Sequence, residues 1–382
     1  MRLIFKLLFS FIYILSFSSC IDDEVSDVIV IKGVTIFDGE IVFRNSNLIF
    51  CKDSIISISS ENAYPKNAIV IEGYGKTVIP PMINAHVHVM DSINLFDAQR
   101  DGIFGMLDMF TTDSRANYFK GFNNRLYSSY YYSSNVGATV PGGHGTQFGI
   151  NIPTINNLIS PKQFVTDRLV AGADYIKITQ ESSMNVMSDS LLELVILEAK
   201  NSNLISIAHI SDVRNAVKLA GFNINGLAHI WYRKGSIIDS IEIQELKSRS
   251  VFVIPTLSVI EEVIKSQIEE INYLKFSEVQ SEVEKLLEND ISILVGTDSP
   301  NFNLNYTTDY FNELELLHSC GLSNIEVLRS ATSNIYKAFN LNEFTFLKSG
   351  GKSSFILLSG DPIERIEEIR NEKRIWKNGI EL

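Results

Sequence analysis

Two histidines separated by one residue mark the stretch where chemistry is most readily placed. His86 and His88 lie in residues 78–89, whose β-branched residues and paired prolines indicate an extended segment. Because side chains alternate across a strand, both imidazoles point to the same side. Two imidazoles at a strand end can bind one divalent metal, although this spacing alone equally fits two polar residues near a strand terminus.

Further polar residues stand at the ends of other predicted strands. They are Lys177 in 174–178, His209 in 204–210, His229 in 226–230 and Asp298 in 291–298. Each has an ordinary explanation, because a buried lysine can pair with a carboxylate and a strand-end aspartate can cap a helix. Histidine is scarce outside functional sites, so the recurrence of these residues at strand ends favours one shared rim.

The middle of the chain alternates predicted strands and helices. The predicted strands are 78–89, 104–111, 135–141, 174–178, 204–210, 226–230, 251–257 and 291–298. The predicted helices include 161–172, 189–201, 211–220, 241–248 and 258–289. Eight strands alternating with helices over about 250 residues have the size of a (β/α)8 TIM barrel, whose active site lies at the C-terminal strand ends. The predicted fold class is therefore α/β, with the barrel over residues 78–345.

Both ends of the chain read differently from the middle. Short β-branched runs separated by turns are predicted at 28–34, 40–44, 48–51, 55–59, 68–72, 352–358 and 373–377. We expect residues 28–77 and 346–382 to form one small β-sandwich domain built from both chain termini.

Composition sets broad limits on function. The chain has 382 residues, 45% of them hydrophobic, and a net charge of −12. Such a chain can bury a large core, and dispersed acidic charge argues against nucleic acid as a partner and favours a small-molecule substrate. Cys51 and Cys320 are expected to be buried small hydrophobes and not a disulfide. Oligomeric state is not predicted.

The first residues have the pattern of a targeting segment. A basic start and an apolar stretch over residues 7–17 precede Ser18, Ser19 and Cys20. This resembles the lipobox of bacterial lipoproteins, which implies a signal peptide over 1–19, lipidation of Cys20 and a tether over 20–27. The protein would then be exported and membrane-anchored, at the periplasmic face or the cell surface. An ordinary secretory signal cut nearby is the alternative.

The ordered motifs together resemble the amidohydrolase superfamily, nearest its imidazolonepropionase- and prolidase-like branch. The matching segments cover nearly everything after residue 27. They are 78–88, 141–145, 172–178, 208–209, 228–229, 296–298 and 328–341. The chain departs from the family pattern at Pro81 and Asn84, where the family usually has glycine and an acidic residue.

The resemblance implies a site with two divalent metal ions, with zinc the first expectation. His86, His88 and Asp298 would bind one ion, and His209 and His229 the other. Lys177 would bridge them as a carbamate formed with carbon dioxide. A hydroxide between the ions would attack a carbonyl, with Asp298 as the general acid and base.

Three residues are implied to contact the substrate. His144 would contact the substrate or the oxyanion formed from it. Tyr232 and Arg233 could bind a substrate carboxylate.

Three functions are compatible with these residues. The first is hydrolysis of a carbon–nitrogen bond in a dipeptide, an N-acyl amino acid or a cyclic amide. The second is a one-metal deaminase of the same fold, in which an acid stands three residues after a histidine, as Asp212 does after His209. The third is a non-catalytic lipoprotein that binds a solute. A bridging Lys177 favours the first, because a single metal has no use for a bridge.

Overall fold

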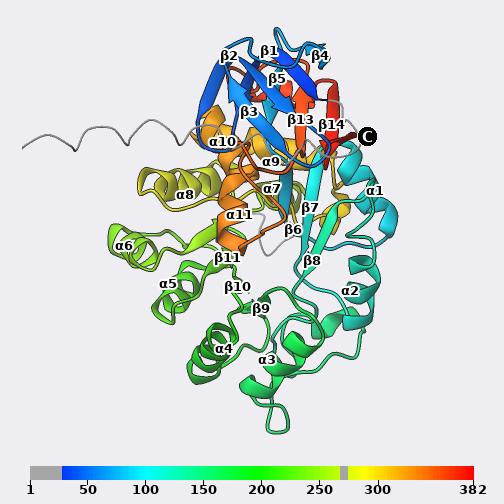
Figure 1. Cartoon of the computed structure of the whole chain (residues 1–382). Coiled ribbons are helices and arrows are strands. Elements are labelled where there is room, and N and C mark those ends of the chain that lie inside the picture. The colour runs from blue at the N-terminus through cyan, green and yellow to red at the C-terminus, as the bar shows by residue number, and fades with distance from the viewer. Residues whose placement is uncertain (1–27, 267–273) are drawn as a thin grey trace, which may run out of the picture.

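The computed structural model describes residues 28–266 and 274–382. Figure 1 shows two regions, a sheet of terminal strands at one end and a larger region of alternating strands and helices below it. The predicted signal peptide, the tether and Cys20 lie outside the described residues. Within those residues, no helix is both long and apolar enough to span a membrane.

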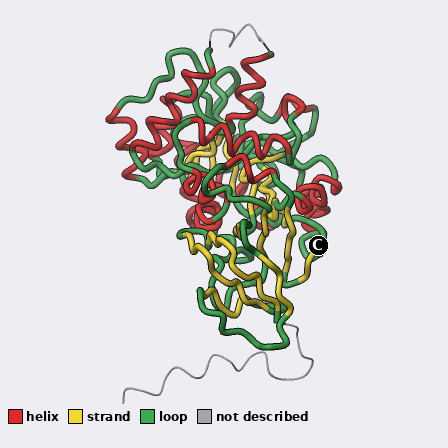
Figure 2. Tube along the Cα trace, turned by 90° about the horizontal axis from the view of Figure 1, so that it is seen from above, coloured by secondary structure: helices red, strands yellow, loops and turns green. Residues whose placement is uncertain are grey.

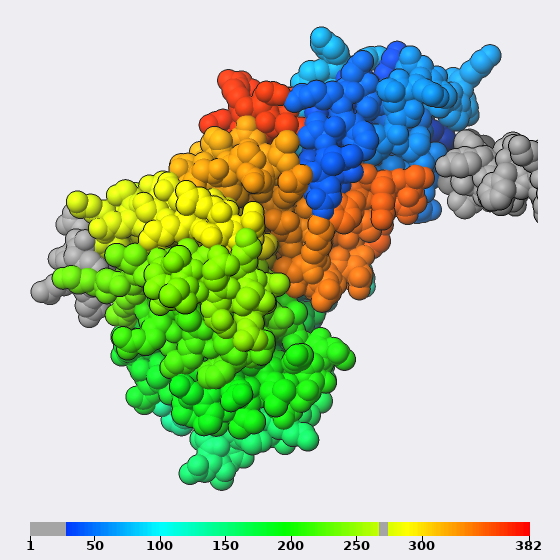
Figure 3. Space-filling view, turned by 90° about the vertical axis from the view of Figure 1, so that its left-hand side faces the viewer, coloured from blue at the N-terminus to red at the C-terminus, as the bar shows by residue number. Residues whose placement is uncertain are grey.

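The terminal sheet is built from both ends of the chain. Its strands run in the order β15-β14-β13-β5-β1-β2-β3, and β4 pairs with β1. The N-terminal strands are β1 (Ile29–Phe37), β2 (Val42–Phe50), β3 (Ile55–Ser59), β4 (Ile69–Glu72) and β5 (Thr77–Ile79), and the C-terminal strands are β13 (Phe355–Leu358), β14 (Lys373–Lys377) and β15 (Ile380–Glu381). Figure 3 shows both ends of the chain, coloured blue and red, at the same end of the molecule. The contribution of both termini is thus confirmed, although the strands form one connected sheet.

An aromatic cluster joins the two halves of this sheet. The rings of Phe355 and Trp376 stack with centroids 5.0 Å apart, and Phe50 meets Phe355 edge-on at 4.9 Å. All three side chains are buried. Aromatic burial of this kind fixes β2 against β13 and β14, which are about 300 residues away in sequence.

The larger region contains two parallel sheets. One has the order β6-β7-β8 and the other β12-β11-β10-β9. Their strands are β6 (Met82–Val87), β7 (Ile103–Asp108), β8 (Tyr130–Ser133), β9 (Ile176–Thr179), β10 (Ser206–His209), β11 (Gly226–Ala228) and β12 (Phe252–Ile254). Isolated parallel bridges continue the pairing from Ala138 to Ile178, from Val253 to Ile293 and from Val87 to Ser299.

Helices surround these strands, as Figure 2 shows in red around yellow. They are α1 (Ser92–Arg100), α2 (Asp113–Lys120), α3 (Pro161–Val170), α4 (Asp189–Asn201), α5 (Val213–Gly221), α6 (Ser240–Ser248), α7 (Leu257–Lys265), α8 (Phe276–Glu288), α9 (Thr308–Ser319), α10 (Asn324–Ala331) and α11 (Ser333–Phe339). Three short 3-10 turns are η1 (Thr146–Phe148), η2 (Asn301–Asn303) and η3 (Ile366–Arg370). Serine side chains cap α3 and α4, as Ser160 and Ser188 accept bonds from backbone amides of the first turn.

Several predicted elements were wrong in detail. The run 78–89 divides at its prolines, because proline cannot donate to a sheet, so β5 belongs to the terminal sheet and β6 to the parallel one. Segments 40–44 and 48–51 are one strand, β2. The predicted helix 258–289 is two helices, since residues 274 and 275 are not helical.

The third and eighth predicted strands also differ. The third strand lies in the tyrosine run of β8 and not at 135–141, where the described pairing is the single bridge of Ala138. Residues 291–298 form no continuous strand, but Ala85 donates to the carbonyl of Val295 at 2.9 Å. The backbone of residues 291–298 still lies beside β6. The side chain of Asp298, at the end of this segment, therefore lies near the histidine of β6 and the one that directly follows this strand. Cys51 and Cys320 are buried and form no disulfide among the described residues, as predicted.

Candidate active site

Asp298 lies between the imidazole of His86, in β6, and that of His88, which directly follows this strand. Its Oδ1 is 3.0 Å from Nε2 of His86 and 2.9 Å from Nε2 of His88. His86 and Asp298 are buried, and His88 is partly exposed to the cavity. Ligand atoms of His86, His229 and Asp298 all lie within 4.8 Å of one another. Two ligand atoms bound to one zinc ion by bonds of about 2.0 Å are themselves about 3 Å apart, so this spacing fits a shared cation.

A backbone carbonyl orients the ring of His88. Its Nδ1 faces the carbonyl oxygen of Phe110 at 3.4 Å, and a carbonyl only accepts, so Nδ1 carries the proton. With the proton on Nδ1, the lone pair on Nε2 faces the lone pairs of Oδ1 of Asp298 and is repelled by them. The two atoms attract each other only when Nε2 is also protonated or when both atoms bind one cation. Burial lowers the pKa of His88 and the hydrogen bond to Asp298 raises it, with a net rise.

The close approach of the segment after residue 291 depends on a glycine. A Cβ atom at Gly296 would lie 2.8 Å from Cβ of His86 and 2.4 Å from a methyl group of Ile254. Only glycine permits that approach. Asn84 links the same segments, because its Nδ2 donates to Oγ1 of Thr297 at 2.9 Å and its Oδ1 accepts from the Thr297 amide at 3.2 Å. Asparagine thus supplies a donor that the family's usual acid lacks.

Lys177 reaches the same place from β9. The side chain is 4% exposed, and Nζ has no hydrogen-bond partner among the described residues. Burial lowers the pKa of Lys177 to about 7. An unpartnered buried amine is costly, so it marks a position where a further group is expected.

His209 and His229 stand opposite β6. Their ring centroids are 4.7 Å apart, and the ring of His229 is 4.9 Å from that of His86. The backbone of His229 has φ of 74° and that of Asp298 has φ of 65°. Left-handed backbone at residues other than glycine is strained and gathers at functional sites. In this strained conformation the side chains of His229 and Asp298 both line the same cavity.

His144 stacks on His209 and lies on a glycine-rich loop. The two rings are 4.6 Å apart and inclined by 12°, and Nδ1 of His144 is 3.2 Å from Nε2 of Gln147. Burial lowers the pKa of His144 to about 3, so the ring is neutral near pH 7. The loop therefore presents a neutral imidazole beside the histidine cluster.

Two buried acids of this region were not predicted from the sequence. Asp108, at the end of β7, accepts from the backbone of Val89 at 3.0 Å and from the Tyr131 hydroxyl at 2.9 Å, and it lies 3.9 Å from Nδ1 of His88. Glu181 follows β9 and accepts from Tyr232 at 3.4 Å and from Arg233. A signal was present for Glu181, which comes three residues after the predicted strand 174–178. Asp108 stands inside the predicted strand 104–111, and only the observed end of β7 places it at a strand end.

One cavity of about 380 Å³ lies among these groups, and Glu181 lines it whereas Asp108 does not. The predicted residues that line it are His86, His88, His144, Lys177, His209, His229, Tyr232, Arg233 and Asp298. Asp212 does not line it, because its carboxylate caps α5 by accepting from the amide of Asn215 at 2.8 Å. His318 also lies outside the cavity, and its Nδ1 bonds to the carbonyl of Leu322 at 2.8 Å, which is a structural role.

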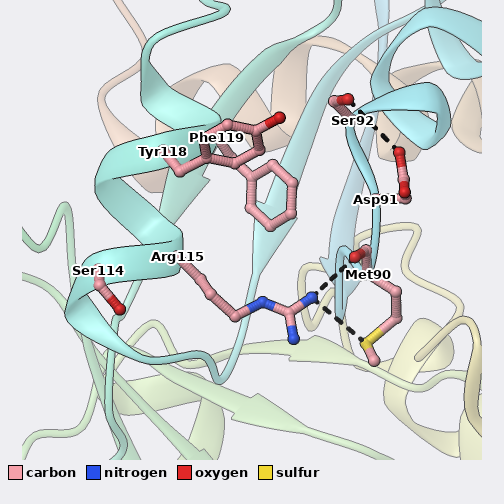
Figure 4. A pocket seen from close by; sticks show the side chains of 7 residues that line it. All are labelled: Met90, Asp91, Ser92, Ser114, Arg115, Tyr118 and Phe119. Atoms are coloured by element: carbon pink, nitrogen blue, oxygen red, sulfur yellow. Dashed lines mark hydrogen bonds between the residues drawn. The ribbon is translucent and has the colours of Figure 1, made fainter.

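A second hollow of about 410 Å³ lies between α2 and the segment after β6 (Figure 4). Arg115 donates to the carbonyl of Met90 at 2.8 Å, and Asp91 caps α1 by accepting from the amide of Ile93 at 3.0 Å. The charged groups of this hollow therefore form hydrogen bonds to nearby backbone groups. None of the predicted site residues lines the hollow.

The α/β fold and the buried histidine–carboxylate cluster define the class of metal-dependent hydrolases. A family model described as the amidohydrolase family matches residues 77–380, and the chain belongs to this family. The ligand atoms around Asp298 are spaced closely enough to bind the divalent metal on which this family depends.

Known proteins are similar over most of the chain. A 5-methylthioadenosine/S-adenosylhomocysteine deaminase of Dictyoglomus turgidum is 24% identical over 370 residues, covering 87% of this chain and 84% of that protein. The structure resembles a Xaa-Pro dipeptidase with bound methionine, with a TM-score of 0.80, 17% identity, and coverage of 93% and 100%. It also resembles A. niger ochratoxinase, with a TM-score of 0.78, 17% identity, and coverage of 93% and 95%. At these identities the two structures show the fold alone.

Proposed function

We propose that the protein hydrolyses a carbon–nitrogen bond in a small amide or peptide-like substrate, as a dipeptidase, a prolidase-like enzyme or a cyclic amidase. The observation that carries this proposal is the Asp298 carboxylate, held at about 3 Å from two imidazoles in the cavity that Lys177 also reaches. The metal ions, the carboxylate that carries the proton and the bound substrate would then share one cavity. Hydrolysis of an unreactive amide requires this proximity.

The proposed cofactors are two divalent ions, with zinc suited to this set of ligands. His86, His88 and Asp298 would hold one ion, and His209 and His229 the other. Lys177 would bridge them as a carbamate, which the buried, unpartnered Nζ supports. When bound, such ions lower the pKa of water and polarise a carbonyl.

The chain's own residues would supply positioning and proton transfer. Asp298 would accept a proton on its carboxylate and deliver it to the leaving nitrogen, which needs a carboxylate facing the cavity. His144 would donate a hydrogen bond to the substrate carbonyl, and its position on the cavity wall supports this role. Tyr232 and Arg233 would contact the part of the substrate remote from the scissile bond.

We also propose that the two parallel sheets form one (β/α)8 barrel over residues 78–345. Support comes from the backbone bonds between the sheets. Ala138 donates to the carbonyl of Lys177 at 2.7 Å, Leu294 donates to Val253 at 2.9 Å, and His88 donates to Ser299 at 2.7 Å. Residues 28–77 and 346–382 would form the separate β domain, together with Val78 and Ile79, because β5 belongs to its sheet and the barrel would then begin at Pro80.

Export and lipidation at Cys20 remain part of the proposal. Their support is the pattern of residues 1–20 in the sequence. An anchored enzyme of this kind would meet its substrate at the membrane surface, at the periplasmic face or outside the cell.

Deamination is the second candidate, favoured by the name of the relative from Dictyoglomus turgidum. A deaminase also breaks a carbon–nitrogen bond, so the two functions differ in the leaving group. The position of Asp212 favours amide hydrolysis, because this acid caps α5 and does not line the cavity.

Turnover of a substrate panel tests the proposal. Zinc-loaded protein would be assayed with a dipeptide, an N-acyl amino acid, a cyclic amide and 5-methylthioadenosine, with a chelated sample beside it. Amide hydrolysis should depend on metal, and Asp298→Asn should lower it by about 10²- to 10⁴-fold. Asp290→Asn, an exposed aspartate paired with Lys247, is the matched control and should change little. Ammonia release from the nucleoside without amide cleavage would favour the deaminase.

A further inference from the structure

The Glu181 carboxylate occupies the polar end of the cavity. It is 6% exposed and accepts bonds from the backbone amide of Ser183 at 3.0 Å and from the Ser183 hydroxyl at 2.9 Å. The hydroxyl of Tyr232 lies at 3.4 Å, and the Arg233 guanidinium is paired with the same carboxylate. Glu181 is therefore a fixed charge and not a mobile surface acid.

Most of these contacts are independent of any metal. His209 also lies 3.3 Å from Glu181 through Nε2, an atom that a metal would take. The bonds from Ser183, Tyr232 and Arg233 involve none of the proposed ligands. The pairing of Glu181 with Arg233 thus persists whether or not His209 binds a cation.

This pairing changes what Arg233 offers to a substrate. A guanidinium that faces a cavity alone attracts a carboxylate, but here a buried anion already neutralises it. An entering carboxylate would have to displace Glu181 or lie beside it, and like charges at short range repel strongly where water is scarce. A neutral group meets no such cost and can donate a hydrogen bond to Glu181.

The rest of the cavity wall is largely apolar. Its apolar side chains are Met109, Phe110, Phe148, Val259, Ile260, Val263 and Phe302. Phe110 and Phe148 meet edge-on with centroids 6.0 Å apart. A bulky or aromatic group of a substrate can bury its surface here.

We propose that the pocket selects amides that carry a bulky apolar group and no free carboxylate, with Glu181 as the residue that sets this preference. The inference rests on the proposed amide hydrolysis and narrows its substrate class, because it excludes dipeptides and N-acyl amino acids, which end in a free carboxylate, and favours uncharged or cyclic amides. It replaces the substrate carboxylate that the sequence placed at Tyr232 and Arg233 with an uncharged polar group.

Two probes of equal size test this selection. N-acetyl-L-phenylalanine carries a carboxylate, and N-acetyl-L-phenylalaninamide replaces it with a neutral amide. Their dissociation constants would be measured by calorimetry on the full chain, both zinc-loaded and chelated. The quantity compared is the ratio of the two constants in each variant, because direct binding of the carboxylate to zinc contributes equally to all variants and cancels.

Glu181→Gln should shift this ratio toward the carboxylate probe by about tenfold. The shift is below that of a fully buried charge pair because the Arg233 side chain is 32% exposed. The double variant Glu181→Gln/Arg233→Gln should return the ratio to the wild-type value. In this variant the positive charge of Arg233, which Glu181 neutralises in the wild type, is also removed. Arg233→Gln alone should shift the ratio the opposite way, which keeps the test decisive if Glu181→Gln folds poorly.

Asp113→Asn is the matched control, because it removes a carboxylate paired with Arg168 at 3.0 Å outside the cavity. It should leave the ratio unchanged. An unchanged ratio in both Glu181→Gln and Arg233→Gln overturns the inference, and so does failure of both probes to bind any variant. If the ratio shifts as expected but no amide is hydrolysed, the charge selection stands and the proposed hydrolysis fails.

Discussion

Nδ1 of His229 lies 2.7 Å from Oγ1 of Thr256. The Thr256 hydroxyl donates its own proton to the carbonyl of Pro255 at 2.8 Å, so it accepts from the imidazole. His229 is thereby held in the tautomer that leaves Nε2 free for a metal. Thr256 has φ of 51° and stands at the N-terminus of α7, whose first amides bond to the buried Glu313.

Thr256→Val should weaken metal binding by about 10- to 100-fold, the usual effect of losing a partner behind a ligating histidine. The two side chains have nearly the same shape, so packing is preserved. Competition with a chelating dye would measure the affinity. Thr256→Ser keeps the hydroxyl and should bind metal like the wild type. Equal affinities for all three proteins would contradict the role of this bond.

If the proposed two-ion site is correct, Lys177→Met should reduce the metal content from two ions per chain to one, because the proposed bridging carbamate is lost. Elemental analysis of the purified protein measures the stoichiometry. Carbon-13 NMR in labelled bicarbonate should show a carbamate signal in the wild type and none in Lys177→Met or Lys177→Arg. Two ions per chain in Lys177→Met would exclude the bridge.

Asp212→Ala should cost about 1 kcal/mol of folding free energy, since its side chain caps α5. Urea unfolding measures this cost. The turnover of the amide substrate per folded molecule should not change, because Asp212 lies outside the cavity. A folded variant that has lost all turnover would instead give Asp212 the catalytic role expected in a deaminase.

Stability should fall as the pH rises through about 7 because of Glu313. Burial raises the pKa of its carboxyl from 4.5 to about 7, so the folded state binds this proton more tightly than the unfolded chain. The stabilisation is complete below pH 4.5 and is lost as the pH passes the folded pKa, amounting to about 2 to 3 kcal/mol between pH 5 and 8. Urea unfolding of the chelated protein at several pH values measures it. Glu313→Gln should remove this slope, and an equal slope in both proteins would assign it to other groups.

Cys20→Ala should abolish incorporation of labelled fatty acid in a bacterial host. The wild-type chain should incorporate the label and fractionate with membranes. Unchanged labelling of the variant would exclude Cys20 as the attachment point.

The position of the site was predictable because strand ends in a parallel α/β fold converge. All six proposed ligands line one cavity. Lys177 lies within β9, and the other five stand at or next to the C-terminal end of a strand or strand-like run. Alternation of side chains and turn residues was enough to place them. Glu181 was not singled out, because its importance depends on its pairing with Arg233, which lies 52 residues away in the sequence.

Details of the strands were less predictable for physical reasons. The third strand is Tyr130–Ser133, where aromatic residues fit a buried sheet as well as the β-branched run that follows. The split between β5 and β6 follows from Pro80 and Pro81, but which sheet each half joins depends on partners in other parts of the chain. Local sequence does not contain that information.

The place of β5 has a consequence for synthesis of the chain. β5 pairs with β1 on one side and with β13 on the other, and its last residue is three positions before β6. A nascent chain has no β13 until residue 358 has left the ribosome. Until then the edge of β5, directly ahead of the first two histidines, lacks this partner, so the sheet that precedes the candidate site can be completed only once nearly the whole chain has been translated.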